Sequence, residues 1–167
     1  MESQLEKEWG VERMKAMELF ESSPVIAAVK DDKGLYRCFD SECQVVFILY
    51  GTILNITDIV RQIKDHGKIA VAHVDLIQGL SAKEVAVDYI RTNTLADGII
   101  STKPLLVKHA VESGLLGVQR TFLIDSMAMS TTKKQIESFR PDAIEIMPGI
   151  MPKVLQLLCR QKLLTTT

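Results

Sequence analysis

An acidic side chain follows the most apolar stretch of the sequence, where residues 69–79 read IAVAHVDLIQG. This continuous, partly β-branched run is typical of a parallel strand that is covered on both faces. Alternation along the strand places His73 and Asp75 on the same face. Ligands of parallel α/β folds bind at the carboxyl ends of strands, so Asp75 and Gln78 are candidate ligand-binding residues.

A structural role is the alternative for both side chains. Asp75 could cap the following turn, and His73 could be an ordinary core histidine.

Further polar residues lie where other strands are expected to end. Glu145 stands inside an apolar strand, where an unpaired carboxylate is costly, so it should face a ligand, be protonated or form a structural ion pair. Ser101 and Thr102 could bind a ligand or cap the helix that begins near Pro104. The remaining candidates for ligand binding at strand ends are Gln119, Asp125 and Gly149.

Strands are predicted to begin near residues 25, 45, 69, 98, 117 and 143, with helices between them. This rhythm is typical of a (β/α)8 barrel, of which six of the eight β/α units are found. We therefore predict a TIM-barrel-like α/β fold that forms an incomplete or open barrel. Asp75, Asp125 and Glu145 should then lie near one rim.

Local signals refine these elements. Residues 31–34 suggest a turn before a short helix at 36–42, and Ser81 with Glu84 suggests a capping box. In the strand near 117, Gln119 and Arg120 must point to opposite faces, and we expect Arg120 to point towards the helices. Residues 1–22 are predicted to form an N-terminal helical extension, followed by one (β/α) domain at 23–167.

Net charge, composition and hydropathy limit the functions that the chain can have. The chain has 167 residues, a net charge of −1 and 5% aromatic residues, so any contact with RNA must be local. Its three cysteines lack the C-x-x-C spacing of zinc or redox sites, and we expect reduced thiols, no metal and no cofactor. No apolar run reaches the length of a membrane span, and the amino terminus lacks a signal-peptide core. We expect a cytoplasmic protein without membrane contact.

Four ordered motifs carry a family resemblance: HVDLIQGL, DGIISTK, QRTFLIDS and PDAIEIMPGIMP, at residues 73–80, 97–103, 119–126 and 141–152. Together they resemble the glycerol-3-phosphate responsive antiterminators, the glycerol uptake operon antiterminator regulatory proteins. The resemblance implies a TIM-barrel-like regulator of glycerol metabolism genes. Such a protein senses glycerol 3-phosphate and binds leader mRNA, so that transcription passes a terminator.

Two classes of function follow, with a truncated, inactive relative as a third possibility. The first is an RNA-binding transcription antitermination regulator without catalytic residues. The second is a TIM-barrel enzyme acting on a small phosphorylated sugar or triose, with Asp75 as the acid or base. For the regulator, Lys133, Lys134 and Arg140 are the candidate RNA contacts, with ordinary solvated helix faces as the alternative. Further basic residues nearby are Lys153, Arg160 and Lys162.

The family pattern continues beyond the sixth unit, so this chain is expected to lack the last two β/α units. The strands at 24–30 and 143–147 should then each lose a neighbour, and copies could associate through the exposed edges. Because clustered acids repel a phosphate dianion, we expect weak binding of glycerol 3-phosphate.

Overall fold

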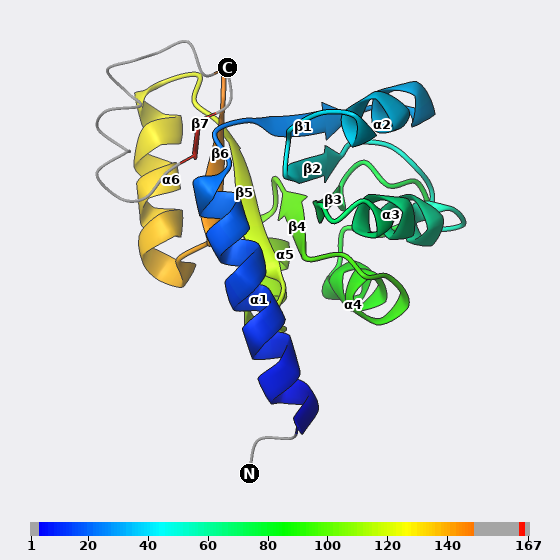
Figure 1. The fold of residues 1–167 in the computed structure, drawn as a ribbon. Helices are drawn as coiled ribbons and strands as arrows, with labels where there is room; N and C mark the ends of the chain where they lie inside the picture. Colours follow the sequence, from blue (N-terminus) through cyan, green and yellow to red (C-terminus); the bar gives the residue numbers. More distant parts are fainter. Residues whose placement is uncertain (1–3, 149–163, 166–167) are drawn as a thin grey trace.

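The computed structural model describes residues 4–148 and 164–165, which form a parallel sheet with helices on both faces (Figure 1). The strands are β1 (Ile26–Val29), β2 (Val45–Ile48), β3 (Ile69–His73), β4 (Gly98–Ser101), β5 (Leu116–Phe122), β6 (Ala143–Met147) and β7 (Leu164–Thr165). The helices are α1 (Gln4–Ser22), α2 (Asp32–Phe39), α3 (Ile56–Asp65), α4 (Glu84–Asn93), α5 (Pro104–Glu112) and α6 (Ser126–Phe139).

The strands follow one another in the sheet in chain order, and every neighbouring pair is parallel. A helix separates each of the first five strands from the next, as in the repeating unit of a TIM barrel. The sheet curls into a half-barrel, which confirms the predicted fold class. All six predicted strand starts lie within one residue of the observed ones.

The expectation that β6 has an exposed edge is wrong. Leu164 and Thr165 pair with Glu145 and Ile146, so the two-residue strand β7 covers part of this edge. At the other end of the sheet, β1 pairs only with β2 among the described residues. Association of copies through β1 stays a prediction.

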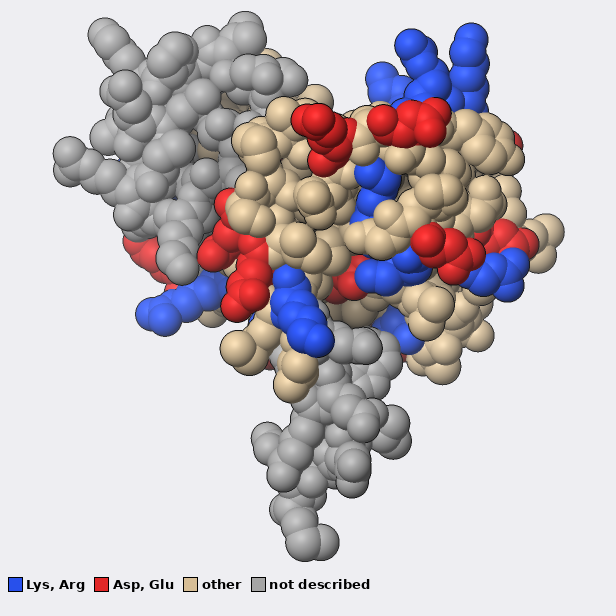
Figure 2. Space-filling model, viewed as in Figure 1, with Lys and Arg blue, Asp and Glu red and all other residues tan. Residues whose placement is uncertain are grey.

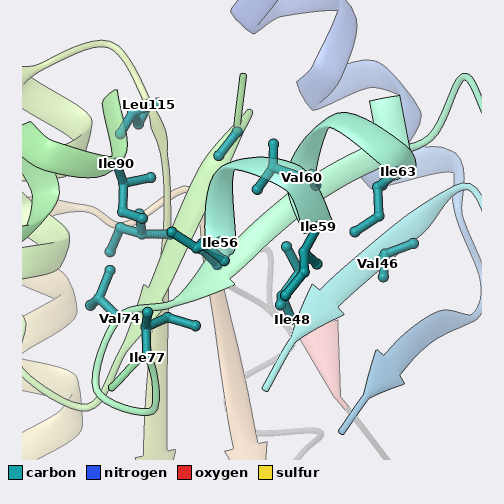
Figure 3. Packing of buried hydrophobic residues seen from close by; sticks show 14 of the residues in the cluster. Val46, Ile48, Ile56, Ile59, Val60, Ile63, Val74, Ile77, Ile90 and Leu115 are labelled. Carbon is teal, nitrogen blue, oxygen red and sulfur yellow. The ribbon is translucent and has the colours of Figure 1, made fainter. Parts of the chain in front are cut away.

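Helices α2 to α5 pack against one face of the sheet, which we call the outer face. There α3 presents Ile56, Ile59, Val60 and Ile63, at helical spacing, to side chains of β2 and β3 (Figure 3). All four side chains are buried, and so are the outward-facing Val46 and Ile48. Burial of this apolar stripe holds the helix against the sheet.

Helix α1 packs against the opposite, inner face (Figure 1). Ala16 and Phe20 are buried there among Val45, Ile69 and other inner-face residues, and the ring of Phe20 stacks on that of Phe47 at 6.2 Å. Arg13 pairs with Asp142 at 2.6 Å. The carboxyl half of the predicted N-terminal extension therefore shares a hydrophobic core with the sheet.

Two local expectations are wrong. Helix α2 begins at Asp32, where a turn was expected, because the side chain of Asp31 accepts the backbone N–H of Gly34 at 2.7 Å and caps the helix. Helix α4 begins at Glu84 after Lys83, whose side chain makes no capping bond, so Ser81 and Glu84 do not form a capping box. Gly67 and Gly114 follow the ends of α3 and α5 with φ of 69° and 88°, as helix-terminating glycines do.

No helix in the described part of the chain is long and apolar enough to cross a membrane.

Candidate functional site

Asp75 is the centre of a hydrogen-bond network that joins the loop after β3 to the end of β4. Its Oδ2 atom accepts the backbone N–H of Thr102 at 2.7 Å and the Thr102 hydroxyl at 2.9 Å. The Ser101 hydroxyl lies 2.9 Å from Oδ1, and Lys103 Nζ lies 3.3 Å from the same atom. The structure therefore brings together Asp75, Ser101 and Thr102, as expected for the carboxyl ends of adjacent strands.

These contacts exclude the capping roles foreseen for the three residues, and ligand binding by them stays a prediction. Asp75 accepts donors from the neighbouring strand end and not from its own turn. Helix α5 has Lys103 at its N-cap position, without a side-chain capping bond, and Pro104 follows. Ser101 and Thr102 thus hold the Asp75 carboxylate and do not cap α5.

Asp75 is kept ionised by its partners. Burial would raise the pKa of Asp75, but hydrogen bonds from Thr102, Ser101 and Lys103 outweigh burial and hold the pKa below its ordinary value of 3.8. A carboxylate with a lowered pKa is a weak general base and is not protonated to act as a general acid at neutral pH.

His73 is buried beside this network on the inner face. Its side chain is 2% exposed, its Nδ1 atom has no hydrogen-bond partner, and this atom lies 4.0 Å from Asp75 Oδ2. Burial lowers the pKa of His73, and the nearby Arg120 guanidinium lowers it further, to about 4, although Asp75 opposes the shift. His73 is therefore neutral at pH 7.

Arg120 and Glu145 form a second polar pair on the inner face. They are cross-strand partners of β5 and β6, and Arg120 donates through Nε to Glu145 Oε2 and through Nη2 to Oε1, the latter at 3.1 Å. The side chains are only 12% and 7% exposed. The sequence left open whether Glu145 binds a ligand or forms an ion pair, and the structure shows the ion pair.

The expected orientation of Arg120 is wrong. Thr121, one residue on, bonds at 2.9 Å to Thr132 of α6, so odd-numbered residues of β5 face the helices. Gln119 shares that face and donates to the carbonyl oxygens of Thr102 at 3.2 Å and Arg120 at 2.9 Å. Its Oε1 atom is buried without a partner. Gln119 therefore lies on the outer face and contacts the site through the backbone of Thr102.

Gln78 and Asp125 do not take part in the hydrogen-bond network of Asp75. Gln78 is exposed, and its backbone bonds to Gly51 and Ile53 in the loop after β2. Asp125 is exposed and caps α6, where it accepts the backbone N–H of Ala128 at 2.7 Å. Gly149 lies outside the described residues, as do Lys153, Arg160 and Lys162.

Lys103 and Arg120 are site residues that the sequence reasoning missed. Each cation pairs with one acid, so the inner face carries Asp75–Lys103 and Arg120–Glu145. A cation therefore offsets each of these two acids, and weak binding of glycerol 3-phosphate stays a prediction.

The predicted RNA contacts Lys133, Lys134 and Arg140 lie on α6 and just after it. All three are exposed, and none forms an ion pair within the described part of the chain. A second group of basic side chains stands out at the upper right of Figure 2, where Figure 1 shows α2. Lys33 and Arg37 of α2 are exposed, and so is Lys30 shortly before this helix. Elsewhere in this view, acidic and basic side chains are interspersed.

No group of three or more His, Cys, Asp or Glu side chains in the described residues is arranged to hold a metal ion. Cys38 and Cys43 are free thiols. The site thus consists of two ion pairs, hydroxyl groups and a neutral imidazole. Groups of these kinds suit a small polar ligand that carries both hydroxyls and an anionic group.

A family model and two solved structures point to one family. Residues 25–166 match the model of the glycerol-3-phosphate responsive antiterminators. The uncharacterised protein YgcP of Escherichia coli K12 is 47% identical over 142 residues, which cover 85% of this chain and 74% of YgcP.

Two solved structures show the same fold. The glycerol uptake operon antiterminator regulatory protein of Listeria monocytogenes has a TM-score of 0.79 and 28% identity, covering 86% of this chain and 79% of its own. A glycerol uptake operon antiterminator-related protein of Thermotoga maritima has a TM-score of 0.74 and 32% identity, covering 83% and 78%. The chain therefore belongs to the glycerol-3-phosphate responsive antiterminator family.

Proposed function

We propose that this protein is a cytoplasmic transcription antitermination regulator that binds leader mRNA of glycerol uptake or metabolism genes and responds to glycerol 3-phosphate. The observation that carries the proposal is the match of residues 25–166 to the antiterminator family. The site supports a regulator over an enzyme, because hydrogen bonds hold Asp75 ionised, Glu145 is paired with Arg120, and the lowered pKa of His73 makes its imidazole a weak base.

For the ligand, we place the phosphate at Lys103. Its ammonium makes the longest contact in the Asp75 network, 3.3 Å, and its side chain is 45% exposed. Asp75 keeps three donors from Ser101 and Thr102 if Lys103 turns away. Lys103 can therefore leave Asp75 for an incoming phosphate without exposing an unpaired buried carboxylate.

The start of α5 supports the same placement. Lys103 occupies the N-cap position, and no side chain caps the first backbone N–H groups of this nine-residue helix. Amide groups at a helix start attract an anion. The glycerol hydroxyls would then lie towards Asp75 and His73, whose carboxylate and unpartnered Nδ1 suit hydroxyl groups.

For the RNA, Lys133, Lys134 and Arg140 remain the proposed contacts, because their charges are exposed and unpaired in the described structure.

Calorimetric titration with glycerol 3-phosphate tests the ligand part, with glycerol and inorganic phosphate as comparison ligands. We expect saturable binding that Lys103→Met weakens at least tenfold. Lys108→Met is the matched control, because Lys108 is also a half-exposed lysine of this region and pairs with Glu112 on the surface of α5. Equal binding by the two variants would contradict this placement of the phosphate.

A further inference from the structure

A pocket opens at the other end of the sheet from Asp75. It has a volume of about 490 Å³ and lies between α1 and the segments that lead into β3, β4 and β5. We call it the amino-end pocket. Its volume falls within the range of small-molecule sites. Its apolar lining comes from Ala16, Leu19, Ile69, Leu95, Ala96 and Leu115.

The charges around the amino-end pocket are unbalanced. Lys64 binds both carboxylate oxygens of Asp97 at 2.7 Å, and Arg13 binds Asp142 at 2.6 Å. In each of these two ion pairs, the acid neutralises the charge of its basic partner. Lys15 also lines the pocket, is exposed, and forms no ion pair within the described residues. Among the described side chains, the pocket therefore has an apolar floor and one positive charge that no ion pair compensates.

Arg13 adds donors to the same wall. Its Nη2 atom donates to Asp142, and its Nε atom lies 3.5 Å from the carbonyl oxygen of Leu115. A guanidinium carries five N–H groups, so others remain to meet an anionic group.

We propose that the amino-end pocket binds a small amphipathic anion, with an apolar chain on the pocket floor and one carboxylate at Lys15 and Arg13. The apolar body is favoured by removal of its surface from water, and the carboxylate by the uncompensated charge. The site is separate from the proposed glycerol 3-phosphate site and does not depend on the proposed function.

This proposal gives α1 a role beyond its core contacts. Arg13, Lys15, Ala16 and Leu19 of α1 form one wall, while the opposite wall belongs to the sheet and its loops. A bound ligand would touch both, and its binding energy would add to the stability of α1 on the sheet.

The test is calorimetric titration of the full chain with decanoate, with decylamine as the cation of matched length. We expect saturable one-to-one binding of decanoate and no comparable binding of decylamine. Leu95→Trp should weaken decanoate binding at least tenfold, because Leu95 lines the pocket, is 64% exposed and so can take a larger side chain that obstructs it. Leu54→Trp is the control, at a site that is 89% exposed and outside the pocket.

If the Leu95→Trp variant does not fold, reversal of the charge at Lys15 still tests the proposal. Lys15→Glu changes an exposed residue. This variant should bind decanoate at least tenfold more weakly than the unmodified chain and should bind decylamine better than decanoate. Absence of saturable decanoate binding to the unmodified chain would overturn the proposal. An equal loss in the Leu95→Trp and Leu54→Trp variants, or a Lys15→Glu variant with unchanged preference, would also overturn it.

Discussion

Arg120 and Glu145 face each other across β5 and β6 as a buried, doubly hydrogen-bonded ion pair on the inner face of the sheet. Glu145→Gln should lower the free energy of unfolding by about 3 kcal/mol, because it leaves a buried guanidinium without its counter-charge. Urea denaturation measures the loss. Glu137→Gln, at an exposed position of α6, should change stability by less than about 0.5 kcal/mol.

The double variant Arg120→Met, Glu145→Leu should recover most of the stability lost in Glu145→Gln, since apolar groups fill the space without a desolvated charge. A Glu145→Gln variant as stable as the unmodified chain would show that the pair is solvated in solution.

His73 should make the fold sensitive to mild acid. Its pKa falls from an ordinary 6.5 to about 4 in the fold, so below pH 6.5 the unfolded chain binds more protons than the folded chain. Stability attributable to neutral His73 is complete above pH 6.5 and declines as the pH falls towards 4. Between pH 7 and pH 5 the decline should be about 2 kcal/mol.

Urea denaturation of the unmodified chain and of His73→Gln at both pH values isolates this effect, because His66 and His109 are common to both. The variant should lose less stability between pH 7 and pH 5. Identical losses would mean that His73 titrates normally in the fold.

Phe20 should be as important to stability as a residue of the sheet. It is 2% exposed and stacks on Phe47, so Phe20→Ala should cost about 3–5 kcal/mol. Met14→Ala is the control on the same helix, because Met14 is 65% exposed. A small effect of Phe20→Ala, similar to that of Met14→Ala, would show that α1 leaves the sheet in solution.

The basic residues on and just after α6 should determine how RNA affinity depends on salt. Replacement of Lys133, Lys134 and Arg140 by alanine should reduce the slope of log affinity against log salt by about 2, as each lost phosphate contact removes about 0.7 to 0.9. Filter binding across a salt series measures the slope. Replacement of Lys30, Lys33 and Arg37 provides a control of equal charge on another surface. A larger change in the control would place the RNA beside α2.

The sequence predicted β2 and β3 well because each is a short, buried and mostly apolar run. The run at Ile69 to His73 also gave the correct alternation, which placed His73 and Asp75 together. Alternation alone could not tell which side of β5 faces the helices, and the orientation of Arg120 was therefore predicted wrongly. Its partnership with Glu145 depends on strand register, which only the fold supplies.

Other features depend on contacts between residues that are distant in sequence. Asp75 meets Lys103 only because β3 and β4 are neighbours, and no local pattern marks that pair. Similarly, the burial of Phe20 depends on Phe47 of β2 and gives no signal in the helix sequence itself. Asp31 favours a turn closed by Gly34 as well as a helix start, because an aspartate side chain accepts backbone N–H groups in both.

The most direct test of the proposed regulation is RNA binding measured with and without glycerol 3-phosphate. The probe is the leader transcript of a glycerol uptake operon from the source genome, including its terminator hairpin, and the readout is fluorescence anisotropy. We predict that glycerol 3-phosphate changes the RNA affinity at least fivefold and that glycerol does not. Lys103→Met should remove this response, whereas Lys108→Met should retain it. Failure of the chain to bind the leader RNA, or an undiminished response in Lys103→Met, would contradict the account.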